Sequence, residues 1–432
     1  MLGGNQQPDD PTGGEVPPKD IVFTTAEIDK YKIIYDADLP ALSIVANNLK
    51  YLLRSKYNES LLVGMDESVI ESEYEILIGD TNRYTEDGKI MEYTISVVDK
   101  KLKIDVGGLF SAEKALEYLE ENVFNTKNGV TLVEGEVTSK SLLISQQAVT
   151  NGTTIRVMSS NVLAEAFDNG SYLTTEYRAE IFAGGLVAFT PDVVGMQETD
   201  SRWENNLDRY LDKIESAHGI KYERYWARYE GKVNYTSLLY RADKFTVGDE
   251  STGDAGVEVF SWWVDPNFNH DYHMRNVSWA KFTSISDQNK TFVLANTHWS
   301  YRTEHDGGNK YLTGSSKPIQ TNELRTQNKD ETNALLTALK NKYKNTPIFL
   351  TGDFNTSLPF FTDSGWLNSS YKVLSEQAKS AGTLIGTVPT SGHFDHIMGT
   401  GNYSVLRFEI FKSGNYVTQL SDHPLVFADV AF

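Results

Sequence analysis

The sequence contains no cysteine, no apolar run long enough to cross a membrane and no excess of basic residues. The absence of cysteine excludes disulfides, thiolate metal sites and a cysteine nucleophile. Acidic residues outnumber basic ones in both parts of the chain, by 26 to 14 over residues 1–150 and by 33 to 26 over residues 151–432. Because proteins that grip nucleic acid by its phosphates carry a basic excess, the net charge of −19 argues against a stable nucleic-acid complex.

With 432 residues, 40% of them hydrophobic, the chain can build two or three packed domains. Residues 1–20 are rich in Gly, Pro, Asp and Gln, and we predict that they form a disordered tether. Such a tether is typical of a chain that has lost an export or lipid-anchor segment, and equally of a plain cytoplasmic tail. An extracellular or cell-surface location therefore stays one of two open interpretations.

Residues 21–148 are predicted to form a small α+β domain with the order β-α-β-β-β-α. Residues 31–35, 74–79, 91–98 and 102–106 have strand patterns. Apolar residues at helical spacing follow Asp36 and Asp38, and a second helix is expected with Ser111 at its N-cap. The phrase EILIGDTNR and the Gly-Gly-plus-helix ending resemble the accessory domain of some hexosaminidases and α-glucuronidases. Because these residues contain no clustered catalytic constellation, we expect a packing or spacer role.

From residue 151 onward strand and helix patterns alternate, which predicts an α/β fold. Polar residues close several of the apolar strands, where α/β sheets place their sites. These residues are Asn161 in MSSNV, Glu198 in VVGMQET, His298 in LANTHWS, Asp353 and Asn355 in FLTGDFN, Asp395 in HFDHIM, and Asp422 with His423 in SDHPL. Each motif alone is equally typical of a turn or a solvated strand end. Six of them in one order indicate a functional site.

This order of motifs, together with the phrases YTSLLYRADKF at 235–245 and RNVSWAKF at 275–282, resembles the endonuclease/exonuclease/phosphatase superfamily over residues 151–432. The resemblance implies a four-layer α/β sandwich like that of deoxyribonuclease I. It also implies a metal-dependent phosphoesterase that attacks phosphorus with an activated water. Such chemistry needs a hard cation, a base for water and donors for the phosphoryl oxygens.

The resemblance also assigns roles to the motif residues. Glu198, Asn161 and Asp422 would form the metal site, with Mg²⁺ expected and Mn²⁺ an alternative. Asp353 would orient and deprotonate water, and Asn355 would donate to a phosphoryl oxygen. Asp395 would hold one tautomer of His423 and raise its pKa. His298 is a further catalytic candidate, since a positioned histidine is a common acid, base or phosphate contact.

Three more residues are candidates for substrate binding: Asn234, Tyr235 and Arg275. Arg275 is either a phosphate-facing guanidinium or a salt bridge at the start of a strand. Several superfamily members have an acidic residue where this chain has Asn234, next to the strand-end histidine. Because an amide stabilises an imidazolium less than a carboxylate does, we predict a lower pKa for His298 than in carboxylate-paired relatives.

Three segments, Val259–Arg275, Trp299–Gln320 and Ser357–Trp366, are expected to form the specificity walls. They contain aromatic residues but few cations, which favours a small or moderately charged phosphoester, either a small molecule or a lipid headgroup. An extracellular nuclease is the main alternative function, and a non-catalytic phosphate- or surface-binding module is the second. The complete set of charged motif residues argues against the non-catalytic module.

Overall fold

The computed structural model describes residues 21–83, 89–125, 131–133, 137–141, 153–165, 173–225, 228–229, 232–233, 235–261, 274–300, 321–358, 361, 371–411 and 420–432. The predicted tether 1–20, residue Asn234 and most of the three predicted specificity walls lie outside the described residues. In the part of the chain that is described, no helix is both long and apolar enough for a bilayer crossing.

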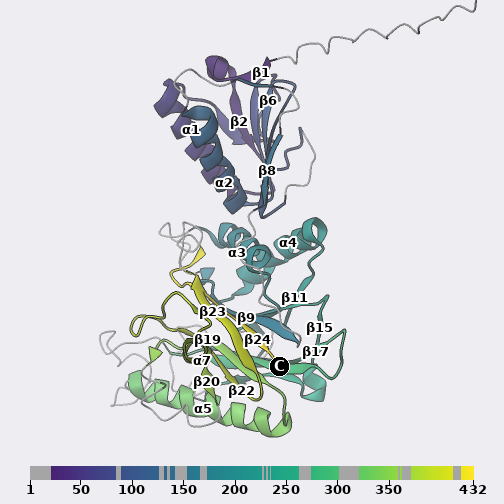
Figure 1. The fold of residues 1–432 in the computed structure, drawn as a ribbon, viewed down its shortest axis with the longest axis vertical. Helices are drawn as coiled ribbons and strands as arrows, with labels where there is room; N and C mark the ends of the chain where they lie inside the picture. The colour runs from purple at the N-terminus through teal and green to yellow at the C-terminus, as the bar shows by residue number, and fades with distance from the viewer. Residues whose placement is uncertain are drawn as a thin grey trace, which may run out of the picture.

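The N-terminal part folds around a six-stranded sheet with the order β3-β2-β4-β6-β5-β8. Its strands are β2 (Lys32–Tyr35), β3 (Val63–Met65), β4 (Glu75–Ile78), β5 (Glu92–Val98), β6 (Lys101–Val106) and β8 (Val137–Ser141). Helices α1 (Leu42–Tyr57) and α2 (Leu109–Leu119) pack together against one face of this sheet through an apolar core (Figure 1). A separate antiparallel pair joins β1 (Ile21–Thr24) to β7 (Thr131–Val133).

The chain beyond residue 153 forms two seven-stranded sheets whose apolar faces pack against each other. The first sheet has the order β11-β14-β10-β9-β24-β23-β21, with β9 at Thr154–Asn161, β10 at Val193–Gln197, β11 at Tyr222–Tyr225, β14 at Leu238–Arg241, β21 at Leu384–Ile385, β23 at Ser404–Phe411 and β24 at Leu425–Ala431. The second has the order β15-β17-β18-β19-β22-β20 with β16 paired to β17, and contains β15 at Phe245–Val247, β16 at Ala255–Val259, β17 at Asn276–Ser284, β18 at Thr291–His298, β19 at Ile348–Asp353, β20 at Lys372–Val373 and β22 at Asp395–Thr400.

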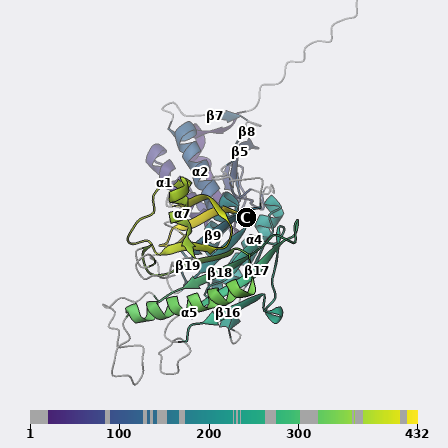
Figure 2. The ribbon, with the colours of Figure 1, turned by 60° about the horizontal axis from the view of Figure 1, so that its bottom comes forward.

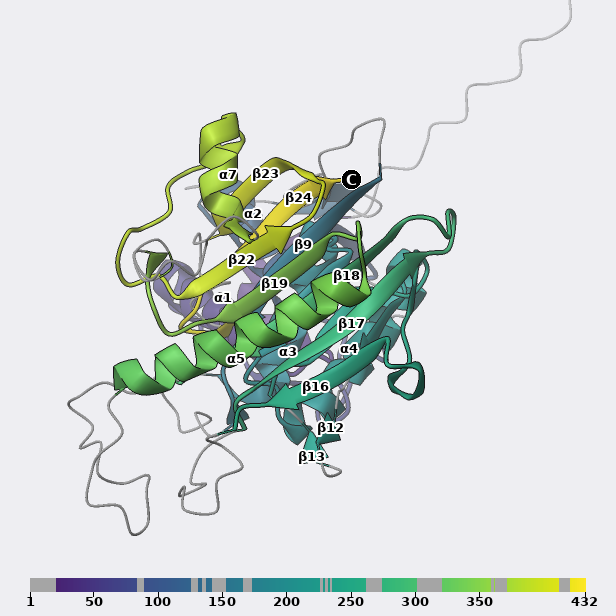
Figure 3. The same ribbon diagram turned by 90° about the horizontal axis from the view of Figure 1, so that it is seen from below.

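Helices cover the outer faces of this sandwich. Helix α5 (Thr321–Lys342) runs along the second sheet (Figure 2; Figure 3). Helices α3 (Thr175–Phe189) and α4 (Ser201–His218) pack on the first sheet and on each other, and α7 (Leu374–Ala381) lies beside β22 and β23. The resulting order of helix, sheet, sheet and helix confirms the predicted four-layer α/β sandwich.

The N-terminal part packs against the α3–α4 layer (Figure 1). One apolar core contains side chains from α1 and α2 as well as from α3 and α4. At its centre Glu180 of α3 accepts hydrogen bonds from the backbone N–H of Ala41 (3.3 Å) and of Leu109 (2.9 Å). These two amides lie at the N-termini of α1 and α2, where backbone N–H groups have no partner within the helix. Glu180 therefore caps both helices at once.

Burial raises the pKa of Glu180 to about 7, although the two backbone N–H groups favour its charged form and act to lower the pKa. Two polar contacts lie at the edge of this interface between the N-terminal part and α4. Arg209 of α4 pairs with Asp38 at 3.2 Å, and the Nε2 of His218 accepts the N–H of Ile90 at 3.2 Å. The two parts of the chain are therefore joined by a buried carboxyl, an apolar core and polar rim contacts.

The helix starts expected in the N-terminal part are wrong. Helix α1 has Ala41 at its N-cap position rather than Asp36 or Asp38, and α2 has Gly108 there rather than Ser111. Ala41 and Gly108 have no side chain that could cap a helix, and Glu180 performs that function from a distant part of the sequence. The expected strands are present within a few residues, whereas α4 and β23 were not expected from the sequence.

Candidate active site

The motif residues meet at one edge of the sandwich because the strands that carry them are in register. In the second sheet His298, Asp353 and Asp395 stand side by side at the ends of β18, β19 and β22. In the first sheet Asn161 ends β9 beside Gln197, and Glu198 follows directly. The site is thus shared by both sheets.

The two sheets are joined beneath this edge by a buried polar network. The Gln197 side chain donates to Asn296 Oδ1 at 2.6 Å, and Asn296 donates to the carbonyl oxygens of Met196 and Ser237. The sheets approach so closely here that a Cβ on Gly195 would lie 1.9 Å from the Thr351 hydroxyl. This network fixes the spacing between the two halves of the site.

Glu198 is held with its carboxylate toward the other motif residues. Its Oε1 accepts from Asn161 Nδ2 (3.0 Å) and its Oε2 accepts from the backbone N–H of Ala164 (2.9 Å). The backbone of Glu198 is left-handed, with φ of 64°. Burial opposes the charge of Glu198, but nearby His298, the two donors and Arg275 outweigh it and lower the pKa. Glu198 therefore presents an ionised carboxylate.

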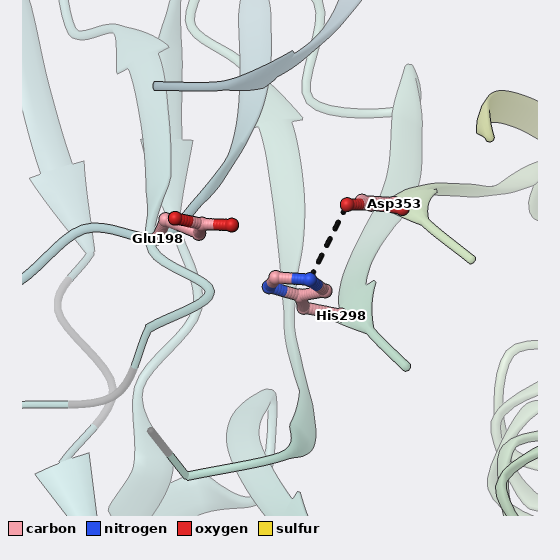
Figure 4. Close-up of side chains that lie close together, drawn as sticks. All are labelled: Glu198, His298 and Asp353. Atoms are coloured by element: carbon pink, nitrogen blue, oxygen red, sulfur yellow. Dashed lines mark ion pairs between the residues drawn. The ribbon is translucent and has the colours of Figure 1, made fainter. Parts of the chain in front are cut away.

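Asp353 lies at the centre of the site. Its Oδ2 is 3.3 Å from His298 Nε2 and accepts from Asn161 Nδ2 at 3.1 Å, while its Oδ1 accepts from the backbone N–H of Asn355 at 2.8 Å. Figure 4 shows Glu198, His298 and Asp353 facing a common space. Burial favours the neutral acid, yet the charge of His423 and the hydrogen bond from His298 lower the pKa of Asp353 well below its usual range.

His298 and His423 flank Asp353 in different environments. Burial and the Arg275 guanidinium lower the pKa of His298, although the carboxylates of Asp353 and Glu198 act to raise it. The Nδ1 of His298 is buried and has no hydrogen-bond partner among the described residues. The predicted contact of His298 with Asn234 lies outside the described residues, so it stays a prediction.

His423 is held by a carboxylate. Its Nδ1 lies 2.7 Å from Asp395 Oδ2, and its Nε2 lies 3.7 Å from Asp353 Oδ2. Burial acts against the charged ring, but the negative charges of Asp395 and Asp353 prevail and raise the pKa of His423 to about 11. Burial also raises the pKa of Asp395, to about 6, so at neutral pH the two groups form an ion pair.

Two groups of side chains bring potential metal-ligand atoms within 4.8 Å of one another: Glu198, His298 and Asp353, and Asp353, Asp395 and His423. The first group supplies two ionised carboxylates, the ligands that Mg²⁺ and Mn²⁺ favour, together with a histidine whose lowered pKa keeps its nitrogen neutral. The donor set therefore fits a hard divalent cation.

The remaining predicted site residues lie around this centre. Arg275 is 5% exposed, and Tyr235 is half-buried with its pKa raised to about 12, chiefly by burial. Asn355 has a left-handed φ of 50° and donates its side-chain amide to the Trp299 carbonyl at 2.9 Å. Asp422 is exposed and accepts from Ser421 at 3.4 Å, outside both groups of potential metal ligands.

Two arginines at the site were not selected from the sequence. Arg325 of α5 is half-buried and donates to the Ser300 carbonyl at 3.5 Å. Burial lowers the pKa of Arg325, and the negative charge of Asp353 acts in the opposite direction. Arg178 of α3 contacts the loop beside Glu198. Both are single cations on helices, and nothing in the helical pattern indicates toward what they point.

Comparisons with solved structures gave matches of low identity. An endonuclease/exonuclease/phosphatase from Bacteroides vulgatus is 22% identical, covers 65% of this chain and 99% of its own, with a TM-score of 0.48. The mannosyl-6-phosphatase of Bacteroides thetaiotaomicron is 19% identical (64% and 100% covered, TM-score 0.47), and truncated TDP2 of Caenorhabditis elegans is 18% identical (65% and 98% covered, TM-score 0.45).

No curated protein matches this sequence. Residues 158–423 match the Endonuclease/Exonuclease/phosphatase family. This stretch begins in β9 and ends at His423, so it contains every motif residue from Asn161 onward. The chain therefore belongs to the endonuclease/exonuclease/phosphatase family.

Proposed function

We propose that the protein is a divalent-metal-dependent phosphoesterase that hydrolyses a small or moderately charged phosphodiester or phosphomonoester. Its family consists of enzymes that hydrolyse phosphoester bonds. The observation that carries the proposal is the sharing of Asp353 between two groups, one with Glu198 and His298 and the other with Asp395 and His423. The arrangement brings anionic ligands, a carboxylate for water and a cationic ring within reach of one phosphoryl group.

Glu198 and Asn161 would hold the cation, and the Asn161 amide also donates to the carboxylates of Glu198 and Asp353. Mg²⁺, or Mn²⁺ in its place, would neutralise charge on the phosphoryl oxygens. Asp422 remains a proposed contributor, and from its exposed position it would reach the cation from the solvent side.

Asp353 is the proposed base. Its lowered pKa keeps it ionised, which suits the orientation of a water but weakens it as a proton acceptor. An anionic phosphoryl group entering beside it would oppose its charge and raise its pKa. We therefore expect Asp353 to orient the water in the resting site and to accept its proton once the substrate is bound.

His423 is the proposed cationic contact. Asp395 fixes the Nδ1 proton, so Nε2–H is directed away from Asp395 and is available to a phosphoryl oxygen or to the leaving group. Asn355 uses one amide hydrogen on Trp299 and keeps a second for substrate. Arg275 and Tyr235 remain proposed substrate contacts, and Arg325 adds a cation on the α5 side.

The proposal is tested with bis-p-nitrophenyl phosphate and p-nitrophenyl phosphate, each with Mg²⁺ and with Mn²⁺. The wild type is compared with Asp353→Ala, Glu198→Ala and the matched exposed carboxylate variant Asp330→Ala. Metal-dependent turnover that both site variants lose and Asp330→Ala keeps supports the phosphoesterase, and the preferred ester separates diesterase from monoesterase. Failure on both esters, together with intact plasmid DNA, sphingomyelin and inositol phosphate, would favour a binding module.

A further inference from the structure

The loop that follows β9 carries a backbone amide that donates to Glu198 Oε2. This loop comprises Val162, Leu163 and Ala164, and the amide is the N–H of Ala164. Its conformation is unusual, because Leu163 has a left-handed φ of 62°, which costs on the order of 1–3 kcal/mol for a side-chain-bearing residue. Such a backbone persists only where its surroundings fix it.

Arg178 of α3 donates three of the hydrogen bonds that hold this loop. Its guanidinium is fully buried and donates to all three loop carbonyls: Val162 at 2.6 Å, Leu163 through a short contact and Ala164 at 3.3 Å. The same group donates to the Leu173 carbonyl at 2.9 Å and the Thr175 hydroxyl at 3.1 Å. Arginine has five N–H donors in a rigid fork, and among the described residues they face these five acceptors on the loop and around the start of α3.

Other contacts hold the loop from its remaining sides. Trp203 of α4 donates its indole N–H to the Leu163 carbonyl at 2.9 Å, and Asn161 Oδ1 accepts the N–H of Leu163 at 3.0 Å. The Arg178 guanidinium also lies 5.5 Å from the centre of the Trp203 ring. These contacts all hold the loop in the conformation in which the Ala164 amide reaches Glu198.

We propose that Arg178 is a positioning residue that sets the ligating orientation of Glu198 through loop 162–164. The inference rests on the proposed function only in taking Glu198 as a ligand of the divalent cation. Changes to groups that orient a metal ligand lower metal affinity by roughly 10- to 100-fold. Lysine keeps the charge of Arg178 but has three donors on one atom, so it cannot replace the fork.

The experiment measures Mn²⁺ affinity of the full chain by electron paramagnetic resonance for wild type, Arg178→Lys and Trp203→Phe. Arg156→Lys is the matched control, because Arg156 is equally buried in β9 but contacts Asp429 and the Phe189 carbonyl instead of the loop. We expect Arg178→Lys to weaken Mn²⁺ binding about 10-fold or more, Trp203→Phe to weaken it several-fold, and Arg156→Lys to leave it unchanged.

Two further readouts separate positioning from loss of fold. Hydrogen–deuterium exchange at the Ala164 amide is expected to accelerate in Arg178→Lys and not in Arg156→Lys. Hydrolysis by Arg178→Lys is expected to need more Mn²⁺ but to approach the wild-type kcat at saturation, whereas partial unfolding would lower kcat at every metal concentration.

Wild-type Mn²⁺ affinity and wild-type Ala164 exchange in folded Arg178→Lys would overturn the positioning role. If that variant does not fold, Trp203→Phe decides in the same way, since it removes one donor to the loop and leaves an aromatic ring in its place. A wild type that neither binds Mn²⁺ nor hydrolyses the esters refutes the proposed function instead, and it also overturns the role of Arg178 in metal binding.

Discussion

The two histidines beside Asp353 differ in charge although they contact the same carboxylate. His298 lies 3.3 Å from Asp353 Oδ2, and burial and Arg275 lower its pKa. His423 lies 3.7 Å from the same oxygen, and its pKa is raised to about 11 despite burial, because Asp395 holds its other nitrogen. At neutral pH the first ring is neutral and the second is a cation.

The comparison shows that the charges around each buried ring decide its protonation: Asp395 and Asp353 outweigh burial at His423, whereas Arg275 adds to burial at His298. A neutral His298 can offer a lone pair to a cation, and a charged His423 can offer a proton to a phosphoryl oxygen. Asp353 lies between these two rings. It can thus act on a phosphoester that meets the cation near His298 and the proton of His423. The following changes alter that contrast, from the largest expected effect to the smallest.

Asp353→Asn removes the charge that both histidines contact. We expect kcat/KM for the preferred nitrophenyl ester to fall by roughly 10⁴-fold, the upper end of the 10²–10⁴-fold that a positioned acid or base contributes, because Asp353 both orients the water and accepts its proton. Steady-state kinetics in saturating Mn²⁺ measures this, with Asp330→Asn as the control. A loss of less than about tenfold would exclude Asp353 as the base.

Asp395→Asn makes His423 more like His298. Without the carboxylate on Nδ1 the pKa of His423 falls from about 11 toward its ordinary value, so the ring is largely neutral at pH 8. We expect about a 10²-fold loss of rate at pH 8 that shrinks as the pH drops below about 6.5, because acid restores the cation. The pH–rate profiles of both proteins check this, and a loss independent of pH would contradict it.

Asn234→Asp is expected to make His298 more like His423. A carboxylate near Nδ1 would stabilise the imidazolium, so we predict that the pKa of His298 rises in the variant. NMR titration of the metal-free variant beside the wild type measures this shift. The absence of any upward shift would mean that residue 234 does not reach the ring.

Glu180→Gln leaves both histidines unchanged and separates their pH dependence from that of the fold. The pKa of Glu180 is raised to about 7 in the folded chain, so the folded state binds more protons than the unfolded state between about pH 4.5 and 7. Its contribution to stability is therefore present at low pH and is lost as the pH rises through that window.

The Glu180→Gln variant should lack this pH dependence, because its amide does not titrate. At pH 5 it should match the wild type within about 1 kcal/mol, because the protonated carboxyl and the amide each offer one carbonyl oxygen to the two helix N-termini. Urea unfolding from pH 5 to 8 measures both effects. Activity should stay within about twofold, since the residue caps helices remote from the phosphoryl site. Parallel stability profiles for the two proteins would contradict the assignment.

The candidate site could be predicted from the sequence because its residues close apolar strands. Asn161, His298 and Asp353 each follow a buried run, and strand register then brings them together. The pairing of Asp395 with His423, 28 positions apart, was expected only from the resemblance to the family. In the structure Asp395 Oδ2 and His423 Nδ1 lie 2.7 Å apart.

Other features could not be predicted because they depend on residues distant in sequence. The caps of α1 and α2 come from Glu180, which is 139 positions from Ala41 and 71 from Leu109. Arg178 and Arg325 lie within helices whose patterns show which positions are apolar, not where one cation points. The division of the chain near residue 150 stays a proposal.

The cap shared by α1 and α2 has a consequence for how the chain unfolds. If the N-terminal sheet separated from the sandwich, Glu180 would lose both amide donors, and the apolar surfaces of α3 and α4 would face water. We therefore expect one cooperative transition for the whole protein instead of two independent ones. A chain shortened to begin at residue 151 should be prone to aggregation, so the N-terminal sheet acts as part of the scaffold on which the enzyme folds.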